Sequence, residues 1–142
     1  MTESQPESVP RTMLAPVSGW LVSLDDVPDP VFSGRMVGDG VAIDPTDSTI
    51  VAPCAGTVAF IHPACHAITI RTDDGIEVLI HIGLDTVQLK GEGFAARVAV
   101  GDAVSTGTPL IEFDADLVAT RARSLLTEVV IATMDRVASL EV

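Results

Sequence analysis

The chain has 142 residues, of which 47% are hydrophobic, and its 8 basic and 20 acidic side chains give a formal net charge of −12. The length fits one domain with a proper core, and the negative charge excludes binding to nucleic acid or anionic lipid through the general electrostatic field. No apolar run is long enough to cross a membrane and no signal peptide is present, so Cys54 and Cys65 are expected to be reduced thiols of a cytoplasmic protein without membrane insertion.

Residues 1–13 are polar, contain proline and show no hydrophobic period, which is typical of a disordered N-terminal tail. The remaining residues, 14–142, are expected to form a single domain. Weak internal repetition runs through this domain. APVSGW at 15–20 is echoed by APCAGT at 52–57, and VGDGV at 37–41 by VGDAV at 100–104.

Short β segments alternate with Gly-Asp, Asp-Pro and Ala-Pro turns through most of the domain. Strands are predicted over 18–23, 40–43, 49–52, 56–61, 66–71, 76–82, 96–100, 109–113 and 128–132. Residues 25–30 are expected to be a loop. The one predicted helix covers about 115–123, with Asp114 as its N-cap. This pattern predicts an all-β fold, a strongly curved sandwich or barrel.

The strongest local signal is a hairpin around Thr72-Asp73-Asp74-Gly75, because glycine takes the positive φ that the turn needs. A three-residue loop places Ile68 and Ile70 opposite Ile80 and Val78, which is the better hydrophobic match, and places His81 opposite Ala67. A two-residue loop pairs His66 with His81 but mixes polar and apolar residues on both faces. In the better register, the two rings meet only if His66 precedes the regular strand or lies on a bulge.

His66 and His81 are the main chemical candidates, because no glycine-rich loop precedes a helix and neither cysteine has the pairing that structural zinc requires. On this pattern alone, an ordinary structural role in the strands is as well supported for the two histidines as a role in a functional site. If they act together, one interpretation is a zinc site, which needs further ligands. The other is phosphoryl transfer, with one ring as nucleophile and the other binding phosphoryl oxygens. Residue types do not decide between them. His62 is expected to lie on the surface.

From about residue 14 to residue 135 the chain resembles the glucose-type enzyme IIA domain of the bacterial phosphoenolpyruvate:sugar phosphotransferase system. The run HIGLDTVQLKGEGF at 81–94 is the most specific match. The other collinear matches are APVSG (15–19), DVPDPVF (26–32), MVGDGVAI (36–43), VAPCAGTV (51–58), HAITI (66–70), VGDAV (100–104), PLIEFD (109–114) and TEVVIATMD (127–135).

This resemblance implies a β-sandwich of the duplicated-hybrid type and no required cofactor. It also implies that His81 is the phospho-acceptor, through Nε2, and that His66 stabilises the phosphoryl group. The implied partners are the phosphocarrier HPr, a cysteine of a sugar-specific IIB domain and regulatory proteins. The face that docks partners would carry Asp29 and Asp85 at its rim. Its apolar collar would comprise Val31, Phe32, Leu79 and Val87.

The chain departs from the family at Ala64, where a threonine often helps to hold the second histidine, so another group is expected to fix the tautomer of His66. Vacant coordination positions predict weak zinc binding by His66 and His81, tightened when a partner adds a carboxylate. Two other functions stay open: a zinc hydrolase similar to lysostaphin-like peptidases, which Leu79 disfavours because it replaces a ligand histidine, and a regulatory module that uses the same face without turnover.

Overall fold

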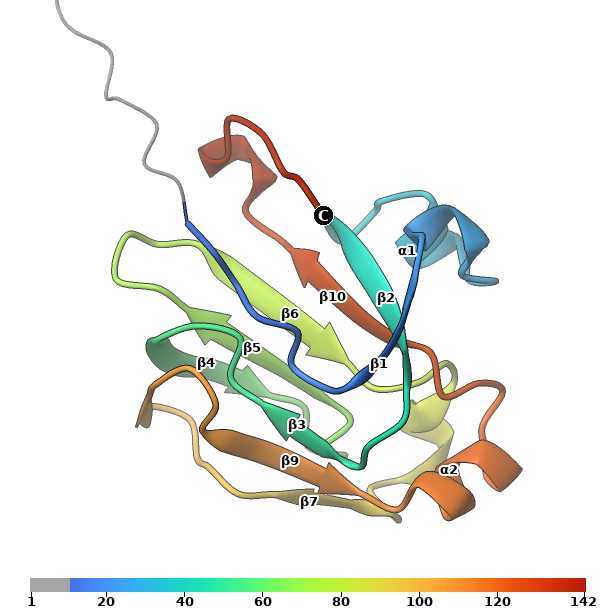
Figure 1. Ribbon diagram of the computed structural model, residues 1–142. Coiled ribbons are helices and arrows are strands. Elements are labelled where there is room, and N and C mark those ends of the chain that lie inside the picture. The colour runs from blue at the N-terminus through green and yellow to red at the C-terminus, as the bar shows by residue number, and fades with distance from the viewer. Residues whose placement is uncertain (1–10) are drawn as a thin grey trace, which may run out of the picture.

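The computed structural model describes residues 11–142, which form a large curved sheet and a small sheet packed together as two open layers (Figure 1). The large sheet has the order β1-β2-β10-β6-β5-β4-β8 and the small one β3-β9-β7, and all neighbouring pairs are antiparallel. The strands are β1 (Gly19–Val22), β2 (Asp39–Pro45), β3 (Thr49–Val51), β4 (Gly56–Ile61), β5 (Ala67–Arg71), β6 (Glu77–His81), β7 (Phe94–Ala96), β8 (Ala103–Val104), β9 (Pro109–Phe113) and β10 (Thr127–Ile131). The predicted all-β sandwich is confirmed.

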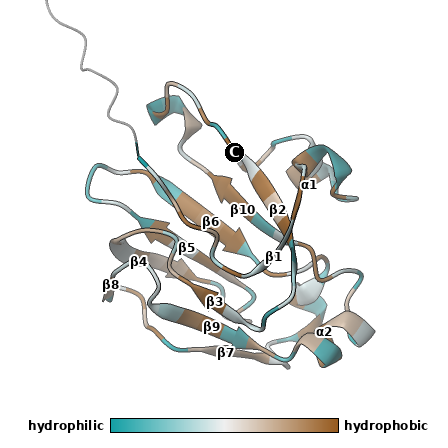
Figure 2. Cartoon of the chain, in the orientation of Figure 1, coloured by the Kyte–Doolittle hydropathy of each residue, from teal (hydrophilic) through white to brown (hydrophobic). Residues whose placement is uncertain are grey.

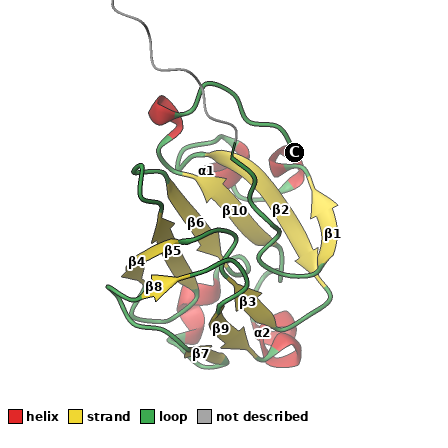
Figure 3. Ribbon diagram, turned by 60° about the vertical axis from the view of Figure 1, so that its left-hand side comes forward, coloured by secondary structure: helices red, strands yellow, loops and turns green. Residues whose placement is uncertain are grey.

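The short helices lie at the periphery of the sheets (Figure 3). They are the α-helices α1 (Pro30–Ser33) and α2 (Ala115–Arg121) and the 3₁₀ helices η1 (Leu24–Asp26), η2 (Thr86–Leu89) and η3 (Met134–Arg136). None of the helices within residues 11–142 is long and apolar enough to cross a bilayer.

The main core lies between the two sheets. Alternation along β5 and β6 sends Ile68, Ile70 and Ile80 inward, where all three are fully buried with residues of β9 such as Leu110. The central residues of strands β2, β6 and β10 are hydrophobic, whereas the turn between β5 and β6 is hydrophilic (Figure 2). Burial of this one face fixes the register of the hairpin, because a slip by one residue would turn the isoleucines to the opposite face.

A second apolar cluster covers the outer face of the large sheet. This cluster contains Leu24 of η1, Val27 of the following turn and Phe32 of α1. These side chains pack over Ala42 of β2 and Val130 of β10. The segment from η1 to α1, residues 24–33, is called the lid below, and it lies against the candidate site. The sequence predicted only a loop over 25–30. Asp29 caps the one-turn helix α1 and Pro30 begins it, a start signal that is too short to produce a helical period.

The other predicted strands lie within two residues of the observed bounds, apart from the differences that follow. The prediction of a strand over 96–100 was wrong, because β7 lies at Phe94–Ala96. The two-residue strand β8 and the 3₁₀ helices were not predicted, since they are too short to show a period. Helix α2 ends two residues early at Arg121, and its predicted cap is confirmed by the Asp114 carboxylate, which accepts from the Leu117 N–H at 3.1 Å.

The predicted tail falls mainly on residues 1–10, outside the described residues. Of the remainder, Arg11 forms an ion pair with Asp74 at 2.8 Å and Met13 packs against a small cluster around Ile76. The two Ala-Pro repeats lie side by side. The Leu14 N–H donates to the Pro53 carbonyl at 3.0 Å, and the Val51 N–H donates to the Pro16 carbonyl at 2.8 Å.

Candidate functional site

The β5–β6 hairpin has the three-residue-loop register. Ile68 lies opposite Ile80, Ile70 opposite Val78 and Ala67 opposite His81. The Thr72 N–H donates to the Ile76 carbonyl at 2.9 Å and closes the turn. His81 therefore projects from the last position of β6 on the outer face of the large sheet, away from the isoleucine core.

His66 lies immediately before β5, outside the regular strand. Cys65 takes a left-handed conformation with φ of +62°, which reverses the chain and breaks the alternation of side chains. The His66 carbonyl still accepts from the Ile82 N–H at 2.8 Å, so the backbone remains tied to the end of β6. The two rings consequently meet, with centroids 5.0 Å apart and planes at 82°.

The tautomer of His81 follows from a backbone contact. Its Nδ1 lies 2.8 Å from the Gly83 carbonyl oxygen, which only accepts, so the proton belongs on Nδ1 and the lone pair on Nε2. The side chain is 21% exposed. Burial lowers the pKa of His81 below its ordinary value, and the ring is thus neutral at neutral pH, as a nucleophilic nitrogen requires.

The ring of His66 is more enclosed, with 3% of the residue exposed. Burial lowers the pKa of His66 to about 4, and the neighbouring His81 and His62 rings contribute in the same direction. Its Nδ1 is buried and has no hydrogen-bond partner among residues 11–142. Ala64 occupies the position where the family often has a threonine, and alanine has no hydroxyl group that could bond to the His66 ring.

His62 was expected at the surface, but it belongs to the site. Its ring centroid lies 4.4 Å from that of His66, and its Nδ1 accepts from the Ala64 N–H at 3.0 Å. The Cys65 N–H also donates to the His62 carbonyl at 2.7 Å, so His62 is the first residue of the tight turn that displaces His66 from the strand. The His-Pro pair at 62–63 was the only local signal of this turn.

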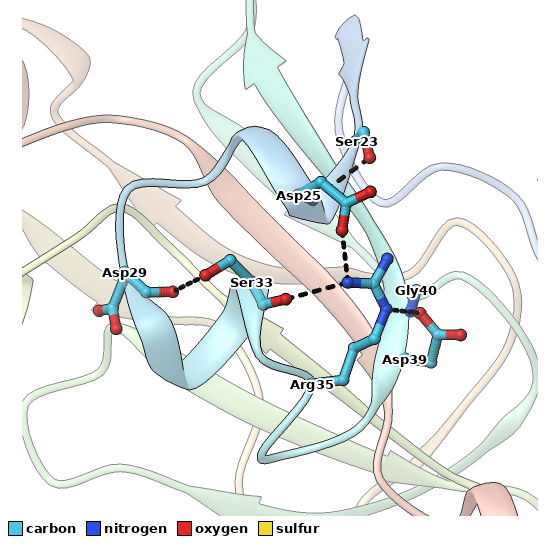
Figure 4. A network of polar contacts seen from close by, with 7 residues as sticks. All are labelled: Ser23, Asp25, Asp29, Ser33, Arg35, Asp39 and Gly40. Atoms are coloured by element: carbon cyan, nitrogen blue, oxygen red, sulfur yellow. Dashed lines mark hydrogen bonds and ion pairs between the residues drawn. The ribbon is translucent and has the colours of Figure 1, made fainter.

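Phe32 also packs against His81, with ring centroids 5.1 Å apart. The lid that carries it is fixed by a polar network around Arg35 (Figure 4). The Arg35 guanidinium donates to the Asp25 carboxylate at 2.7 Å, to the Asp39 carboxylate at 3.2 Å and to the Ser33 carbonyl at 2.9 Å. These contacts join η1, α1 and β2, and thereby hold Phe32 against the histidine.

The six residues predicted to dock partners differ in accessibility. Val31 and Val87 are 39% and 51% exposed, and Asp85 is also exposed. Leu79 and Asp29 are half-buried, and Asp29 accepts from the Val31 N–H at 3.0 Å as the cap of α1. The charge of Asp29 opposes the effect of burial and favours a higher pKa for His81.

Phe32 differs from the other five, because it is only 4% exposed. It supports the His81 ring and offers little surface to a partner. Among the four apolar residues of the predicted collar, Val31 and Val87 are the two that are exposed.

One functional candidate was missed entirely. Glu128 of β10 lies opposite His81 in the sheet and is fully buried, and its Oε1 lies 3.3 Å from Nδ1 of His81. Burial raises the pKa of Glu128 to about 10, and the nearby charge of Asp29 acts in the same direction. The only sequence signal was a charged residue inside the apolar strand TEVVI.

The zinc interpretation gains no support from this geometry. Among residues 11–142, no group of three or more His, Cys, Asp or Glu side chains is arranged to hold a metal ion. Cys54 and Cys65 are both free.

Comparisons with known proteins identify the family of the chain. Residues 11–137 match the family described as phosphoenolpyruvate-dependent sugar phosphotransferase system, EIIA 1. The chain is 50% identical over 127 residues to a glucose-specific EIIA component of Halalkalibacterium halodurans, covering 89% of this chain and 73% of the relative. It is 46% identical over 131 residues to the corresponding component of Bacillus cereus, covering 92% and 79%.

A solved structure shows the same fold. The glucose permease IIA from Mycoplasma capricolum superposes with a TM-score of 0.84 at 39% identity, over 86% of this chain and 79% of that one. Family match, sequence identity and fold agree over most of the chain. The chain therefore belongs to the EIIA 1 family of the phosphoenolpyruvate-dependent sugar phosphotransferase system.

Proposed function

We propose that His81 accepts a phosphoryl group on Nε2 from phosphorylated HPr and passes it to a cysteine of a sugar-specific IIB domain. The chain is a phosphotransferase component, and its family carries phosphoryl groups during sugar uptake without a cofactor. The observation that carries the assignment to His81 is the contact of Nδ1 with the Gly83 carbonyl at 2.8 Å. It leaves the Nε2 lone pair of a neutral ring free to attack.

In the loading step, the Nε2 lone pair of His81 forms a bond to phosphorus while the P–N bond of the donor breaks. The bonding electrons of that broken bond return to the donor imidazole. The His81 ring gains positive charge as its Nδ1–H remains bonded to Gly83. In delivery, a partner thiolate forms the S–P bond, the P–N bond breaks and its electrons restore the neutral ring. Charge changes at His81 in both steps, so nearby acceptors and donors matter most in the transition states.

His66 is proposed to stabilise the phosphoryl oxygens without forming a covalent bond. Its ring lies 5.0 Å from that of His81, and its buried Nδ1 has no partner among the described residues. An unpaired buried N–H is costlier than an unpaired acceptor, which favours the proton on Nε2. The ring can then donate from Nε2 to phosphoryl oxygens.

The proposed docking surface is the face around His81, with Val31, Val87 and the half-buried Leu79 as its apolar part and Asp29 and Asp85 at its rim. Exposed apolar side chains beside a reactive group are suited to excluding water when a partner docks. Acidic rim residues and the net charge of −12 favour partners with a basic face. HPr, a IIB domain and regulatory proteins would use this one surface in turn.

We further propose that residues 14–142 act as one IIA domain in the cytoplasm. The family match spans residues 11–137, and the free thiols of Cys54 and Cys65 suit a reducing compartment.

Incubation with phosphoenolpyruvate, enzyme I and HPr tests the proposal. The expected product gains the mass of one phosphoryl group, which is lost in acid and retained in alkali, and a His81→Gln variant gains none. A phosphoryl group that survives acid, or a fully loaded His81→Gln variant, would show that another residue is the acceptor.

A further inference from the structure

The buried carboxyl group of Glu128 has no structural partner that explains its place in the sheet. The residue is 0% exposed, and neither carboxyl oxygen makes a hydrogen bond within residues 11–142. A polar group buried in this way costs free energy, and most buried polar groups are paired. A residue kept for stability alone would be apolar at this position, between Ala42 of β2 and His81 of β6.

The Glu128 carboxyl group closely approaches the ring of the proposed phospho-acceptor, His81. Oε1 lies 3.3 Å from Nδ1 of His81, on the opposite strand, while Nδ1–H is directed at the Gly83 carbonyl at 2.8 Å. The contact with Glu128 is thus a close approach short of a regular hydrogen bond. Catalytic hydrogen bonds are often long in the resting protein and shorten as charge develops.

We propose that Glu128 is a positioning residue for His81, placed to act as a second acceptor for Nδ1–H as Nε2 takes up the phosphoryl group. This inference rests on the proposed function of His81. When Nε2 donates its lone pair to phosphorus, the ring becomes cationic and Nδ1–H becomes a stronger donor. The Gly83 carbonyl can accept from one direction, and Oε1 lies close enough to accept from another as the positive charge on the ring grows.

Several charged or titratable groups face this pair. Asp29 caps α1 and influences both residues, His66 packs against His81 from the position before β5, and His62 contributes from the start of the preceding turn. Because burial raises the pKa of Glu128 to about 10, its carboxyl is neutral in the resting protein at neutral pH. Glutamine therefore reproduces both the size of the side chain and its carbonyl acceptor.

Three variants separate positioning from packing. Glu128→Gln keeps the acceptor oxygen, Glu128→Met keeps a similar volume without it, and Glu112→Met makes the same substitution at an exposed position on β9. We expect Glu128→Met to accept phosphate from phospho-HPr about ten- to a hundredfold more slowly, the range for losing a hydrogen bond to a charged group. Its resistance to denaturant should be equal to that of the wild type or greater, because a buried unpaired polar group has been removed. Glu128→Gln and Glu112→Met should load within about threefold of the wild-type rate.

The ¹⁵N and ¹H signals of Nδ1–H in unphosphorylated His81 supply a readout that needs no phosphoryl transfer. They should change in Glu128→Met and be restored in Glu128→Gln. The inference is overturned if Glu128→Met leaves these signals unchanged, or if it loads at the wild-type rate. A wild-type protein that accepts no phosphate at His81 would instead refute the proposed function, and the ring signals would still decide whether Glu128 positions Nδ1–H.

Discussion

At the scale of single residues, the two histidines of the site are chemically distinct because their surroundings differ. His81 has a fixed proton on Nδ1 through Gly83, whereas Nδ1 of His66 has no partner within residues 11–142. Burial lowers the pKa of both, and that of His66 to about 4. The neutral forms are therefore favoured at neutral pH, and only His81 has the tautomer of a nucleophile defined by a backbone contact.

Substitution of each histidine by glutamine should separate their roles. His66→Gln keeps an amide donor, so His81 should load at a near-normal rate. Delivery to a IIB cysteine should be strongly slowed, because the amide group of glutamine is a weaker substitute for the imidazole Nε2–H proposed to bind the phosphoryl oxygens in the transition state. The loss of a strong donor in a shielded site corresponds to about 2–4 kcal/mol of barrier. Single-turnover transfer from purified phosphoprotein measures this step. Normal loading of His81→Gln together with no loading of His66→Gln would mean that the two roles are reversed.

The apolar part of the docking surface can be tested by removing methyl groups. Val87→Ala and Val31→Ala should each weaken HPr binding by about 1–2 kcal/mol, since both side chains are exposed and would be desolvated by a partner. Val100→Ala is the matched control, because Val100 is 60% exposed in the loop before β8. Charge reversal at Asp85 should mainly slow association and alter its salt dependence. Titration calorimetry that gives equal affinities for Val87→Ala, Val31→Ala and the control would place the docking surface elsewhere.

At the scale of elements, the loop after β6 determines where the acceptor carbonyl lies. Gly83 has φ of +75°, and a Cβ there would lie 2.6 Å from Cγ2 of Thr86 and 2.7 Å from the Ser124 carbonyl oxygen. The Thr86 hydroxyl donates to the Ile82 carbonyl at 2.7 Å, and the Leu84 N–H donates to the Ser124 carbonyl at 3.0 Å. The loop is therefore tied on both sides and cannot shift to accept a side chain.

Gly83→Ala should lower stability and slow the loading of His81. The expected loss of stability is about 1–3 kcal/mol beyond that of Gly101→Ala, because Gly101 also has a positive φ, of +94°, but a Cβ added there would meet nothing within 4 Å. The control carries the conformational strain alone, so the difference reports crowding. Chemical denaturation and the loading rate check both effects. Equal behaviour of the two variants would show that the loop tolerates a shift at Gly83.

The sequence predicted the hairpin well because its information is local. Period-two alternation and Asp74-Gly75 determine which isoleucines face each other, and His81 follows from that register. The displacement of His66 depends on a left-handed Cys65, a conformation that the residues His-Pro-Ala-Cys do not specify. Glu128 could not be assigned from its own strand, because its environment is created by β6 and by the lid from η1 and α1. The positions of His66 and Glu128 in the site depend on packing between segments that are distant in the sequence, which a local pattern does not encode.

At the scale of the whole molecule, buried titratable groups should shape the dependence of stability on pH. The folded-state pKa of Glu128, about 10, lies above its ordinary value of 4.5. Its contribution to the free energy of unfolding is therefore fully present below pH 4.5 and is lost as pH rises toward 10. His66 acts on the acid side, because its folded pKa of about 4 lies below 6.5 and stability falls as pH drops between these values.

Glu128→Gln should consequently gain stability relative to the wild type as pH rises from 5 to 9. The difference should increase by at most about 1.4 kcal/mol per pH unit, the value for one proton. Urea denaturation at several pH values measures it, with Glu112→Gln as the exposed control. A difference between Glu128→Gln and the wild type that stays constant over this range would contradict a neutral Glu128 in the folded protein.

The position of the bond to phosphorus tests the central claim most directly. The protein is labelled with ¹⁵N at histidine, phosphorylated through enzyme I and HPr, and kept at alkaline pH for ³¹P and ¹⁵N NMR. We predict one phosphorus signal coupled to Nε2 of His81, with Nδ1 still protonated and bonded to the Gly83 carbonyl. Coupling to Nδ1 of His81, or to a nitrogen of His66 or His62, would contradict the account.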